Sequence, residues 1–357
     1  MNQRPQKTNN SIRHKRKDQH LELALALPDG PSSACFEDIR FEPEALPDLS
    51  LEDIDISTSF CGLTMKAPLL INALTGGTRQ SAYINARLAQ VAKQTGLGLA
   101  VGSQRIALDD PSVAYSFKIV RSIYPKGTIF ANIGAGSNVH EACRAVEMLA
   151  AQGLQVHLNV AQEMAMAEGD RSFYWSEHIA DIAQKIPVPI VAKEVGFGLT
   201  GATVKRLLKL GVAGVDVGGS GGTNFILVEH SRRGRHRSPL GDWGLPTVWS
   251  LLDVLGTNPN AEVCASGGIR NGLDMAKALA LGARVCGVAK PLLQAVTKRG
   301  VKAGVTFVQR CLDELRTVMV LVGAKDLPSL RQKPILFGRE TFAYLRQRGL
   351  ADLWIRR

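Results

Sequence analysis

Eight short apolar runs alternate with helix-like segments between residues 68 and 290 of the chain. The runs are rich in Val and Ile and lack strict polar alternation, which is typical of strands that are buried on both faces. The segments between them place apolar residues three and four positions apart, as amphipathic helices do. The eight runs are Pro68–Leu74, Leu97–Ser103, Ile129–Ala135, Leu154–Val160, Val188–Gly196, Gly214–Gly219, Glu262–Gly268 and Arg284–Lys290.

Clear helical spacing is found in Ser81–Thr95, Asn138–Gln152, Thr203–Leu210 and Leu273–Leu281. Eight strand–helix units over about this length predict a (β/α)8 TIM barrel, an α/β fold. A doubly wound sheet is the alternative, but its Gly-x-Gly-x-x-Gly turn is missing after the first run. We therefore predict a barrel with a C-terminal helical tail over residues 67–357, after an N-terminal extension over residues 1–66.

The composition fits one large soluble domain with appendages. With 357 residues and 45% hydrophobic content, the chain can bury a sizeable core. It contains no run of about 18 apolar residues, and its polar, basic N-terminus is unlike a secretory signal. The six cysteines are scattered without metal-like spacing, as reduced buried thiols are. These features predict a cytoplasmic enzyme without a membrane partner.

A formal charge of +11 calls for an anionic partner. Basic residues cluster near the start, from Arg13 to Lys17, and again from Arg232 to Arg237. Such clusters can bind nucleic acid. However, aromatic residues make up only 6% of the chain and do not interleave with the clusters, so a base-stacking surface is not expected. We favour highly anionic small substrates over nucleic acid, and a solvated basic tail is the remaining alternative for either cluster.

Polar residues follow the predicted strands at their carboxyl ends, where barrels of this kind carry their chemistry. Two of these ends are glycine-rich, Gly218–Thr223 and Gly267–Arg270. Backbone N–H groups of the second loop precede a helix that begins near Asn271, and a helix N-terminus favours phosphate. We therefore predict a phosphate monoester site at the late strands, which is a recurrent barrel feature.

The segment Gln155–Glu163 combines an apolar strand with polar side chains. Since side chains alternate along a strand, His157 and Asn159 share one face, with Gln162 and Glu163 beyond the strand end. A satisfied core histidine beside a polar loop is one interpretation. We favour a diphosphate–metal site, in which Glu163 is the ligand of a hard metal such as Mg²⁺. His157 and Asn159 would donate to diphosphate oxygens, with Arg16, Lys17 and Arg105 as further clamps.

Lys193 is predicted to point into the barrel from the fifth strand, where a lysine is costly to bury without an anion. Its neighbour Glu194 points the other way along the strand. We favour a bound anion as the partner, and an ion pair with a carboxylate elsewhere in the chain is the alternative. The paired carboxylates of a conventional acid–base enzyme are hard to find in the sequence.

Taken together, these residues resemble one known family, the type 2 (FMN-dependent) isopentenyl diphosphate isomerases. The resemblance runs in order from about residue 13 to 295. Its motifs are Arg16-Lys17-x-x-His20, Asn72–Gly77, Val101–Arg105, His157-Leu158-Asn159 with Gln162-Glu163, Glu168–Arg171, Lys193–Gly196, Gly221–Phe225, Asp242–Gly244 and Ser266–Arg270. Flavin barrels in general share only the glycine loops and the lysine.

The resemblance implies three sets of site residues. FMN would be bound by Thr75, Gly76, Gly77, Ser103, Asn132, Lys193 and Thr223, and its phosphate by Gly267, Gly268, Arg270 and Ala289. The substrate diphosphate would be bound by Arg16, Lys17, Ser103, Arg105, His157, Asn159 and Gln162, with Mg²⁺ on Glu163 and Trp243 as a wall. Gln162, Lys193 and His157 would be the catalytic residues, and the basic N-terminal segment a lid.

The implied reaction interconverts isopentenyl diphosphate and dimethylallyl diphosphate with reduced FMN, Mg²⁺ and NADPH as the reductant, in a homotetramer or homo-octamer. An FMN-dependent 2-hydroxy-acid oxidase is the first alternative. It needs a histidine base near the seventh strand, and no histidine follows Ser266 in this chain. A non-catalytic basic barrel that binds RNA or an acidic partner is the second alternative.

Overall fold

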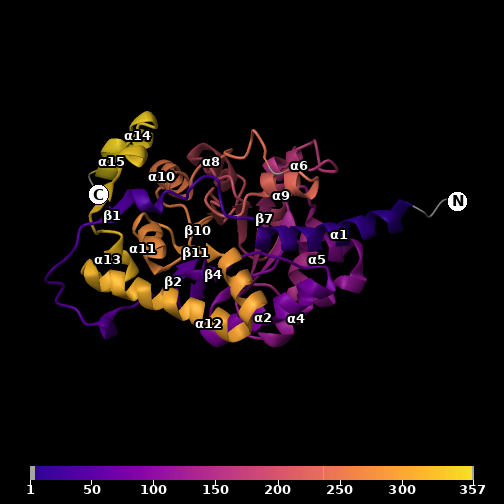
Figure 1. Ribbon diagram of the computed structural model, residues 1–357, viewed down its shortest axis with the longest axis horizontal. Coiled ribbons are helices and arrows are strands. Elements are labelled where there is room, and N and C mark those ends of the chain that lie inside the picture. Colours follow the sequence, from indigo (N-terminus) through magenta and orange to yellow (C-terminus); the bar gives the residue numbers. More distant parts are fainter. Residues whose placement is uncertain (1–4, 236, 356–357) are drawn as a thin grey trace.

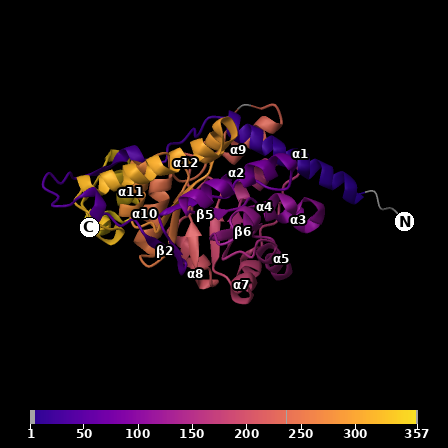
Figure 2. The same cartoon turned by 90° about the horizontal axis from the view of Figure 1, so that it is seen from below.

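The computed structural model describes residues 5–235 and 237–355. Eight parallel strands close into a barrel in the order β10-β11-β4-β5-β6-β7-β8-β9, and helices surround it (Figures 1 and 2). The strands are β4 (Leu69–Ile71), β5 (Gly98–Ala100), β6 (Ile129–Gly134), β7 (Gly153–Leu158), β8 (Ile190–Glu194), β9 (Gly214–Asp216), β10 (Val263–Ser266) and β11 (Val285–Val288). Each overlaps one of the eight predicted runs, so the predicted (β/α)8 barrel is confirmed.

Several of the helices around the barrel begin at a side chain that caps them. Thr78, Asn138, Thr200 and Asn271 each accept a backbone N–H of the helix that follows, which satisfies a donor without an intrahelical partner. The α-helices from the first barrel strand to the C-terminal tail are α2 (Arg79–Thr95), α3 (Arg105–Asp109), α4 (Tyr115–Ile123), α5 (Val139–Leu149), α6 (Val160–Ala165), α7 (Ser176–Lys185), α8 (Gly201–Lys209), α9 (Phe225–Arg232), α10 (Thr247–Thr257), α11 (Gly272–Ala280) and α12 (Lys290–Leu321).

The amino-terminal half of the barrel interior is apolar. Its inward side chains come from alternate strand positions and pack into one cluster: Leu70, Ala100, Phe130, Val191, Cys264 and Val285. The hairpin of β2 (Thr58–Phe60) and β3 (Leu63–Met65) closes this end, because Phe60 and Met65 join the same cluster. Polar chemistry is therefore confined to the carboxyl half of the barrel.

The N-terminal extension lies against both the barrel and the C-terminal tail. Strand β1 (Ile39–Phe41) pairs antiparallel with β12 (Ile335–Phe337), which is followed by α14 (Arg339–Gln347) and α15 (Ala351–Ile355). A short helix, α13 (Leu327–Leu330), precedes β12. Helix α1 (Pro5–Ala26) packs against α9 and α12, and its side chains are described from Arg16 onward (Figure 1). The division at residues 66 and 67 stays a prediction.

Among the described residues, the structure contains no helix that combines the length and the apolar character needed to cross a membrane.

Candidate functional site

A buried carboxylate organises the polar half of the barrel. Asp216, at the end of β9, is fully buried and accepts from Lys193 Nζ at 2.8 Å, Asn72 Nδ2 at 2.6 Å and Ser266 Oγ at 2.5 Å. The backbone N–H of Gly218 is a fourth donor at 3.2 Å. Four donors around one buried carboxyl group are the environment of an ionised, acceptor-only carboxylate.

The alternative for Lys193, an ion pair with a carboxylate elsewhere in the chain, is therefore confirmed, and the favoured bound anion is not needed as its partner. In the parallel ladder of β8 and β9, Lys193 is in register with Asp216, which brings ammonium and carboxylate together inside the barrel. The sequence carried a signal that was missed, because an aspartate inside the apolar run Gly214–Gly219 must be buried. The Lys193 side chain keeps 11% of its surface exposed, so it can still contact a ligand at the barrel mouth.

His157 lies at the same level of the barrel, on β7. Its Nδ1 atom is 2.9 Å from Asn132 Oδ1. Burial, followed by the positive charges of Lys17 and Lys193, lowers the pKa of the His157 imidazole to about 4. His157 is therefore neutral at physiological pH. The interpretation as a hydrogen-bonded histidine is confirmed, and its contact with a diphosphate stays a prediction.

Asn159 and Glu163 lie at the start of α6 rather than on a strand. Strand β7 ends at Leu158, so Val160, which the pattern placed on the strand, begins the helix and is 42% exposed. Asn159 Nδ2 donates to Glu163 Oε1 at 2.7 Å, and the N–H of Asp170 donates to Oε2 at 2.8 Å. Both oxygens of Glu163 are thus oriented by the protein.

Among the described residues, no group of three or more His, Cys, Asp or Glu side chains converges on a metal position. The single carboxylate of Glu163 nevertheless fits Mg²⁺, which commonly takes one or two carboxylates and completes its shell with waters and substrate phosphates. The donor set is therefore compatible with a metal that arrives with a diphosphate. It does not suit an all-protein metal cage.

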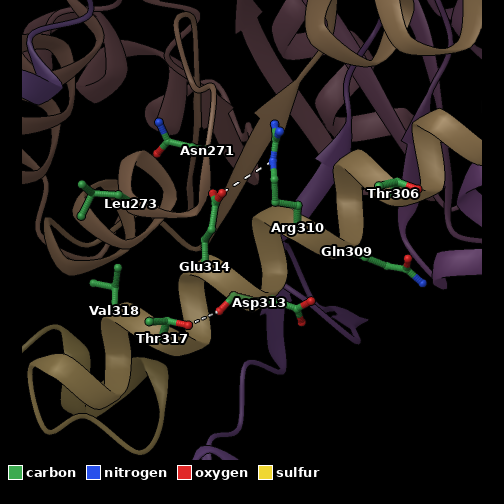
Figure 3. A pocket seen from close by; sticks show the side chains of 9 residues that line it. All are labelled: Asn271, Leu273, Thr306, Gln309, Arg310, Asp313, Glu314, Thr317 and Val318. Atoms are coloured by element: carbon green, nitrogen blue, oxygen red, sulfur yellow. Dashed lines mark hydrogen bonds and ion pairs between the residues drawn. The ribbon is translucent and has the colours of Figure 1, made fainter. Parts of the chain in front are cut away.

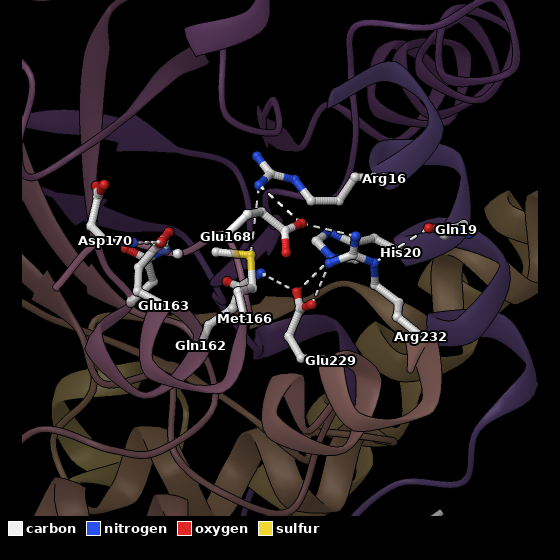
Figure 4. A network of polar contacts seen from close by, with 12 residues as sticks. Arg16, Gln19, His20, Gln162, Glu163, Met166, Glu168, Asp170, Glu229 and Arg232 are labelled. Atoms are coloured by element: carbon white, nitrogen blue, oxygen red, sulfur yellow. Dashed lines mark hydrogen bonds and ion pairs between the residues drawn. The ribbon is translucent and has the colours of Figure 1, made fainter. Parts of the chain in front are cut away.

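Glu229 is the site residue that the sequence analysis missed. It lies on α9, is 1% exposed and faces Gln162, whose Nε2 is 3.4 Å from its Oε1 (Figure 4). His20 Nε2 lies 2.6 Å from the same oxygen, without the alignment of a good hydrogen bond, and Arg232 Nη1 is 2.5 Å from Oε2. Only its place on a helix that follows a glycine-rich loop could have pointed to it.

The charges in this cluster are set by burial and pairing. Burial alone would raise the pKa of Glu229, but His20 and Arg232 outweigh it and hold that pKa below its ordinary value. Burial lowers the pKa of His20, although Glu229 opposes the shift. At neutral pH the pair therefore consists of a carboxylate and a neutral imidazole next to Gln162.

The second basic cluster is partly structural. Arg232 belongs to α9, and it pairs with both Glu229 and Glu168. Arg233 Nη2 donates to the carbonyl oxygen of Ala165 at 2.7 Å, which ties α9 to the end of α6. The alternative of a solvated basic segment is therefore wrong at Arg232 and Arg233. His236 lies outside the described residues.

Helix α1 brings the first basic cluster to the barrel mouth. Lys17 Nζ donates to the carbonyl oxygen of Ser103 at 2.8 Å. Burial and the charge of Arg16 lower the pKa of Lys17 to about 7. Arg16 Nη1 is 3.8 Å from Glu168, on the segment after α6. The side chains of Arg13 and Lys15 lie outside the described part of the chain.

Two further predicted substrate residues are more exposed. Arg105 forms ion pairs with Asp109 at 3.2 Å and Glu141 at 2.6 Å, and its side chain is 47% exposed. Trp243 lies in the loop before α10 and is 59% exposed. Neither residue lies among the buried groups around Asp216, so their contacts with a substrate stay predictions.

The two glycine loops meet at the late strands. Gly267 and Gly268 have φ values of 96° and 88°, which side chains rarely adopt. A Cβ on Gly267 would lie 2.0 Å from the carbonyl oxygen of Gly219, and one on Gly222 would lie 3.1 Å from the N atom of Gly268. The close approach of the loops thus requires glycine.

Cationic side chains lie beside these loops. Arg270 Nε and Lys290 Nζ are each 3.0 Å from the carboxylate of Asp29, in the segment that follows α1. Thr223 and Lys290 line a small cavity of about 110 Å³, together with residues of α1 and α9. Glycine-loop backbone and two cations are the groups that a phosphate monoester requires, so the residues present fit the phosphate end of FMN.

The expected free N–H groups at the start of α11 are, however, already bonded. The N–H of Gly272 donates to Glu314 Oε2 at 2.7 Å, and that of Asp274 donates to Asn271 Oδ1 at 2.8 Å. The N–H of Arg270 donates to Asp274 Oδ2 at 3.0 Å. These N–H groups are therefore satisfied by Asn271, by Asp274 and by Glu314 of α12, and a phosphate would have to rely on the loop and on the cations.

The remaining predicted FMN residues lie at the same face. Thr75 Oγ1 bonds Ser81 Oγ at 2.7 Å, and the N–H of Gly77 donates to Ser116 Oγ at 2.8 Å. Gly76 packs so closely on Phe117 that a Cβ would lie 2.0 Å from the ring. Ser103 and Ala289 follow β5 and β11, and Asn132 lies within β6. The structure brings the predicted flavin set to one end of the barrel.

A surface groove of about 720 Å³ lies elsewhere, between the start of α11 and the outer face of α12 (Figure 3). It is lined by side chains such as Asn271, Arg310 and Glu314, and it contains none of the predicted site residues.

Comparison with known proteins agrees with this geometry. A family model described as FMN-dependent dehydrogenase matches residues 126–336. The isopentenyl-diphosphate delta-isomerase of Latilactobacillus sakei subsp. sakei (strain 23K) is 40% identical over 342 residues, covering 96% of this chain and 98% of the relative. The enzyme of the same name from Staphylococcus aureus (strain JH9) is 41% identical over 340 residues, covering 95% and 97%.

Solved structures share the fold at lower identity. The lactate oxidase of Pediococcus acidilactici superposes with a TM-score of 0.69 at 14% identity, over 95% of this chain and 96% of that one. Flavocytochrome b2 gives a TM-score of 0.68 at 20% identity, over 89% and 82%. These likenesses concern the fold alone, whereas the relatives with 40% and 41% identity span nearly the whole length. The chain therefore belongs to the isopentenyl-diphosphate delta-isomerases of the FMN-dependent, type 2 form.

Proposed function

We propose that the protein interconverts isopentenyl diphosphate and dimethylallyl diphosphate with reduced FMN and Mg²⁺. The observation that carries the proposal is the juxtaposition of two polar sets at one barrel mouth. One is the predicted flavin set around Lys193 and the two glycine loops. The other is the predicted diphosphate set on β7 and α6, which lies under the basic helix α1.

The chemistry needs a proton to be added at the terminal methylene carbon and another to be removed from C2, through a species with cationic character. Reduced FMN would supply an electron-rich face and an exchangeable proton there. The protein has to hold the substrate over that face and exclude water. Lys193, which the Asp216 carboxylate holds in place, would present its ammonium group under the mouth, where it would favour the anionic form of a reduced flavin.

Gln162 and Glu229 are the protein groups that we place beside the reacting carbons. The Glu229 carboxylate orients the Gln162 amide, and the charge of Arg232 keeps it ionised. Since Glu229 is buried and unprotonated at neutral pH, it can orient the allylic system and relay a proton through Gln162. This assignment gives the buried cluster on α9 a chemical role.

The diphosphate would be bound by the basic and amide side chains under α1. We assign this role to Arg16, Lys17, Ser103, Arg105, His157, Asn159 and Gln162, with Mg²⁺ on Glu163 and Trp243 at the outer wall. Because Arg16 and Lys17 are carried by α1, substrate binding and coverage of the site occur together. NADPH as the reductant and a homotetramer or homo-octamer as the assembly are proposed only from the resemblance to the family.

The test is isomerisation of isopentenyl diphosphate by the purified protein with FMN and Mg²⁺, with and without reductant under anaerobic conditions. We expect dimethylallyl diphosphate only when the flavin is reduced. Turnover that is independent of flavin would contradict the cofactor role. Flavin binding without product, followed by oxidation of a 2-hydroxy acid, would favour the oxidase alternative instead.

Glu163→Gln is expected to weaken Mg²⁺-dependent substrate binding by at least about tenfold, because even indirect ligand partners typically contribute that much to metal affinity. FMN content should stay unchanged, since the Glu163 side chain bonds Asn159 and the N–H of Asp170 among the described residues, and neither is a predicted flavin residue. The measurement is KM for substrate across a Mg²⁺ titration, with flavin absorbance as the second readout. Glu168→Gln, on a nearby exposed carboxylate, is the matched control. An unchanged Mg²⁺ dependence would remove Glu163 as the metal ligand.

A further inference from the structure

Three buried side-chain amides link Asp216 to His157 across the barrel interior. Asn72 Nδ2 donates to Asp216 Oδ2 at 2.6 Å, and Gln155 Nε2 donates to Asn72 Oδ1 at 3.0 Å. Asn132 Nδ2 donates to Gln155 Oε1 at 3.0 Å, and Asn132 Oδ1 lies 2.9 Å from His157 Nδ1. The three amides are each no more than 2% exposed, so water cannot readily replace these bonds.

The Asp216 carboxylate fixes the direction of the hydrogen bonds between these amide side chains. An ionised carboxylate can only accept hydrogen bonds, so the end of Asn72 that faces Asp216 must be its NH₂ group. The carbonyl end of Asn72 then faces Gln155 and must receive an N–H from it. It also accepts the backbone N–H of Ala73 at 2.9 Å, which fixes the same orientation independently. Because the NH₂ group of Gln155 faces Asn72, Gln155 must present its carbonyl oxygen to Asn132.

The last link decides where the imidazole proton lies. Asn132 uses its NH₂ group on Gln155 and presents its carbonyl oxygen to His157 Nδ1, so Nδ1 must carry a proton. The pKa of about 4 makes the ring neutral, and Nε2 therefore carries a lone pair. The charged groups that act on the ring are Lys17 from α1 and Lys193 from β8, and both oppose a second proton. The carbonyl of Ile133 on β6 has a smaller, opposite effect.

We propose that Asp216 is a positioning residue that acts through Asn72, Gln155 and Asn132 to hold His157 as the Nδ1–H tautomer. Nε2 can then donate to a diphosphate oxygen only after it has taken up a second proton from solvent. Substrate binding is thus coupled to the uptake of a proton at His157. No bond of the substrate changes in this step, and the diphosphate charge offsets the positive charge on the ring. The proton coupling rests on the proposed function, whereas the tautomer does not.

The proton count must be separated from that of Lys17, which also lies at the mouth and has a pKa of about 7. Lys17→Arg removes this contribution, because a guanidinium keeps its charge and does not titrate near neutrality. When all the compared variants carry Lys17→Arg, the protons exchanged by the diphosphate and by Mg²⁺ are the same in each and cancel in the difference. Gln155 is the residue to substitute in order to interrupt the hydrogen bonds between Asp216 and His157. Replacing Asp216 itself would leave Lys193 buried without its partner.

The first experiment is calorimetric titration of isopentenyl diphosphate, and separately inorganic diphosphate, into FMN-loaded protein with Mg²⁺ in buffers of different ionisation enthalpy. Lys17→Arg is expected to take up about one proton more per site than Lys17→Arg/His157→Gln. Adding Gln155→Leu should reduce that excess to less than half, because Asn132 is free to turn and either tautomer can form. Gln155→Glu should restore it, since the buried side chain in its protonated form donates its O–H to Asn72 Oδ1 and still accepts from Asn132. Equal proton counts in all variants would overturn the coupling.

The second experiment is ¹⁵N NMR of the histidine rings in FMN-loaded protein without substrate, with His157 assigned by its loss in His157→Gln. We expect a protonated Nδ1 and an unprotonated Nε2, and a mixture of tautomers in Gln155→Leu. A protonated Nε2 in the unaltered protein would overturn the assignment whatever the substrate is. If the NMR result holds but neither diphosphate binds, the proposed function and the proton coupling fail together and the tautomer stands.

Discussion

Lys193→Met is expected to destabilise the fold by about 3 kcal/mol and to abolish flavin-dependent turnover. Removal of one partner of a buried ion pair leaves the other charge uncompensated, and such changes typically cost about 3–5 kcal/mol. Asp216 keeps Asn72, Ser266 and Gly218 as donors, so we place the loss at the lower end. The measurements are urea unfolding, the fraction of bound FMN after purification, and turnover.

The matched control is the double variant Lys193→Met/Asp216→Asn. It removes both charges and should recover most of the stability, because a neutral pair avoids an unpaired buried ion. It should not recover turnover, since the positive charge at the barrel mouth is still missing. If the double variant were as unstable as the single one, the Lys193–Asp216 pair would not be the source of the loss. If it were active, the charge of Lys193 would have no role in the reaction.

Glu229→Gln is expected to lower kcat by about 10²–10³-fold, the range of a positioned acid–base group, while flavin stays bound. The variant keeps the size of the side chain but removes the charge that faces Gln162, His20 and Arg232. Glu168→Gln is the control, because Glu168 pairs with the same Arg232 at 2.9 Å but is 38% exposed. It should change kcat by less than about threefold, as surface ion pairs contribute little.

The pH profile gives an independent readout for Glu229. The pKa values of both Glu229 and His20 lie below their ordinary values. The active pair of carboxylate and neutral imidazole therefore persists as the pH falls through the ordinary histidine range near 6.5, and is lost only below it. The decrease of kcat at low pH, which marks the loss of this pair, should disappear or shift to another pH in Glu229→Gln. An unchanged decrease would assign it to another group.

The barrel could be predicted from the sequence because each strand and helix carries its own local signal. The apolar runs mark strands buried on both faces, and several helices begin at capping residues such as Thr78 and Asn271. Patterns with periods of two and 3.6 residues need no knowledge of distant partners. The glycine loops could be predicted from local sequence as well, because glycine adopts positive φ values at little steric cost.

The pairing of the inward side chains was decided only by the tertiary structure. Lys193 and Asp216 are 23 positions apart, and Gln155 reaches Asn72 across 83 positions, yet both contacts form once the strands are in register and the barrel is closed. His20 and Glu229 meet only because α1 packs against α9. The local pattern shows that a residue points inward but not which residue it meets, since that depends on strand register and helix docking. The sequence alone therefore determined the barrel and which of its ends carries the chemistry, and the tertiary structure decided which charges, tautomers and donors act there.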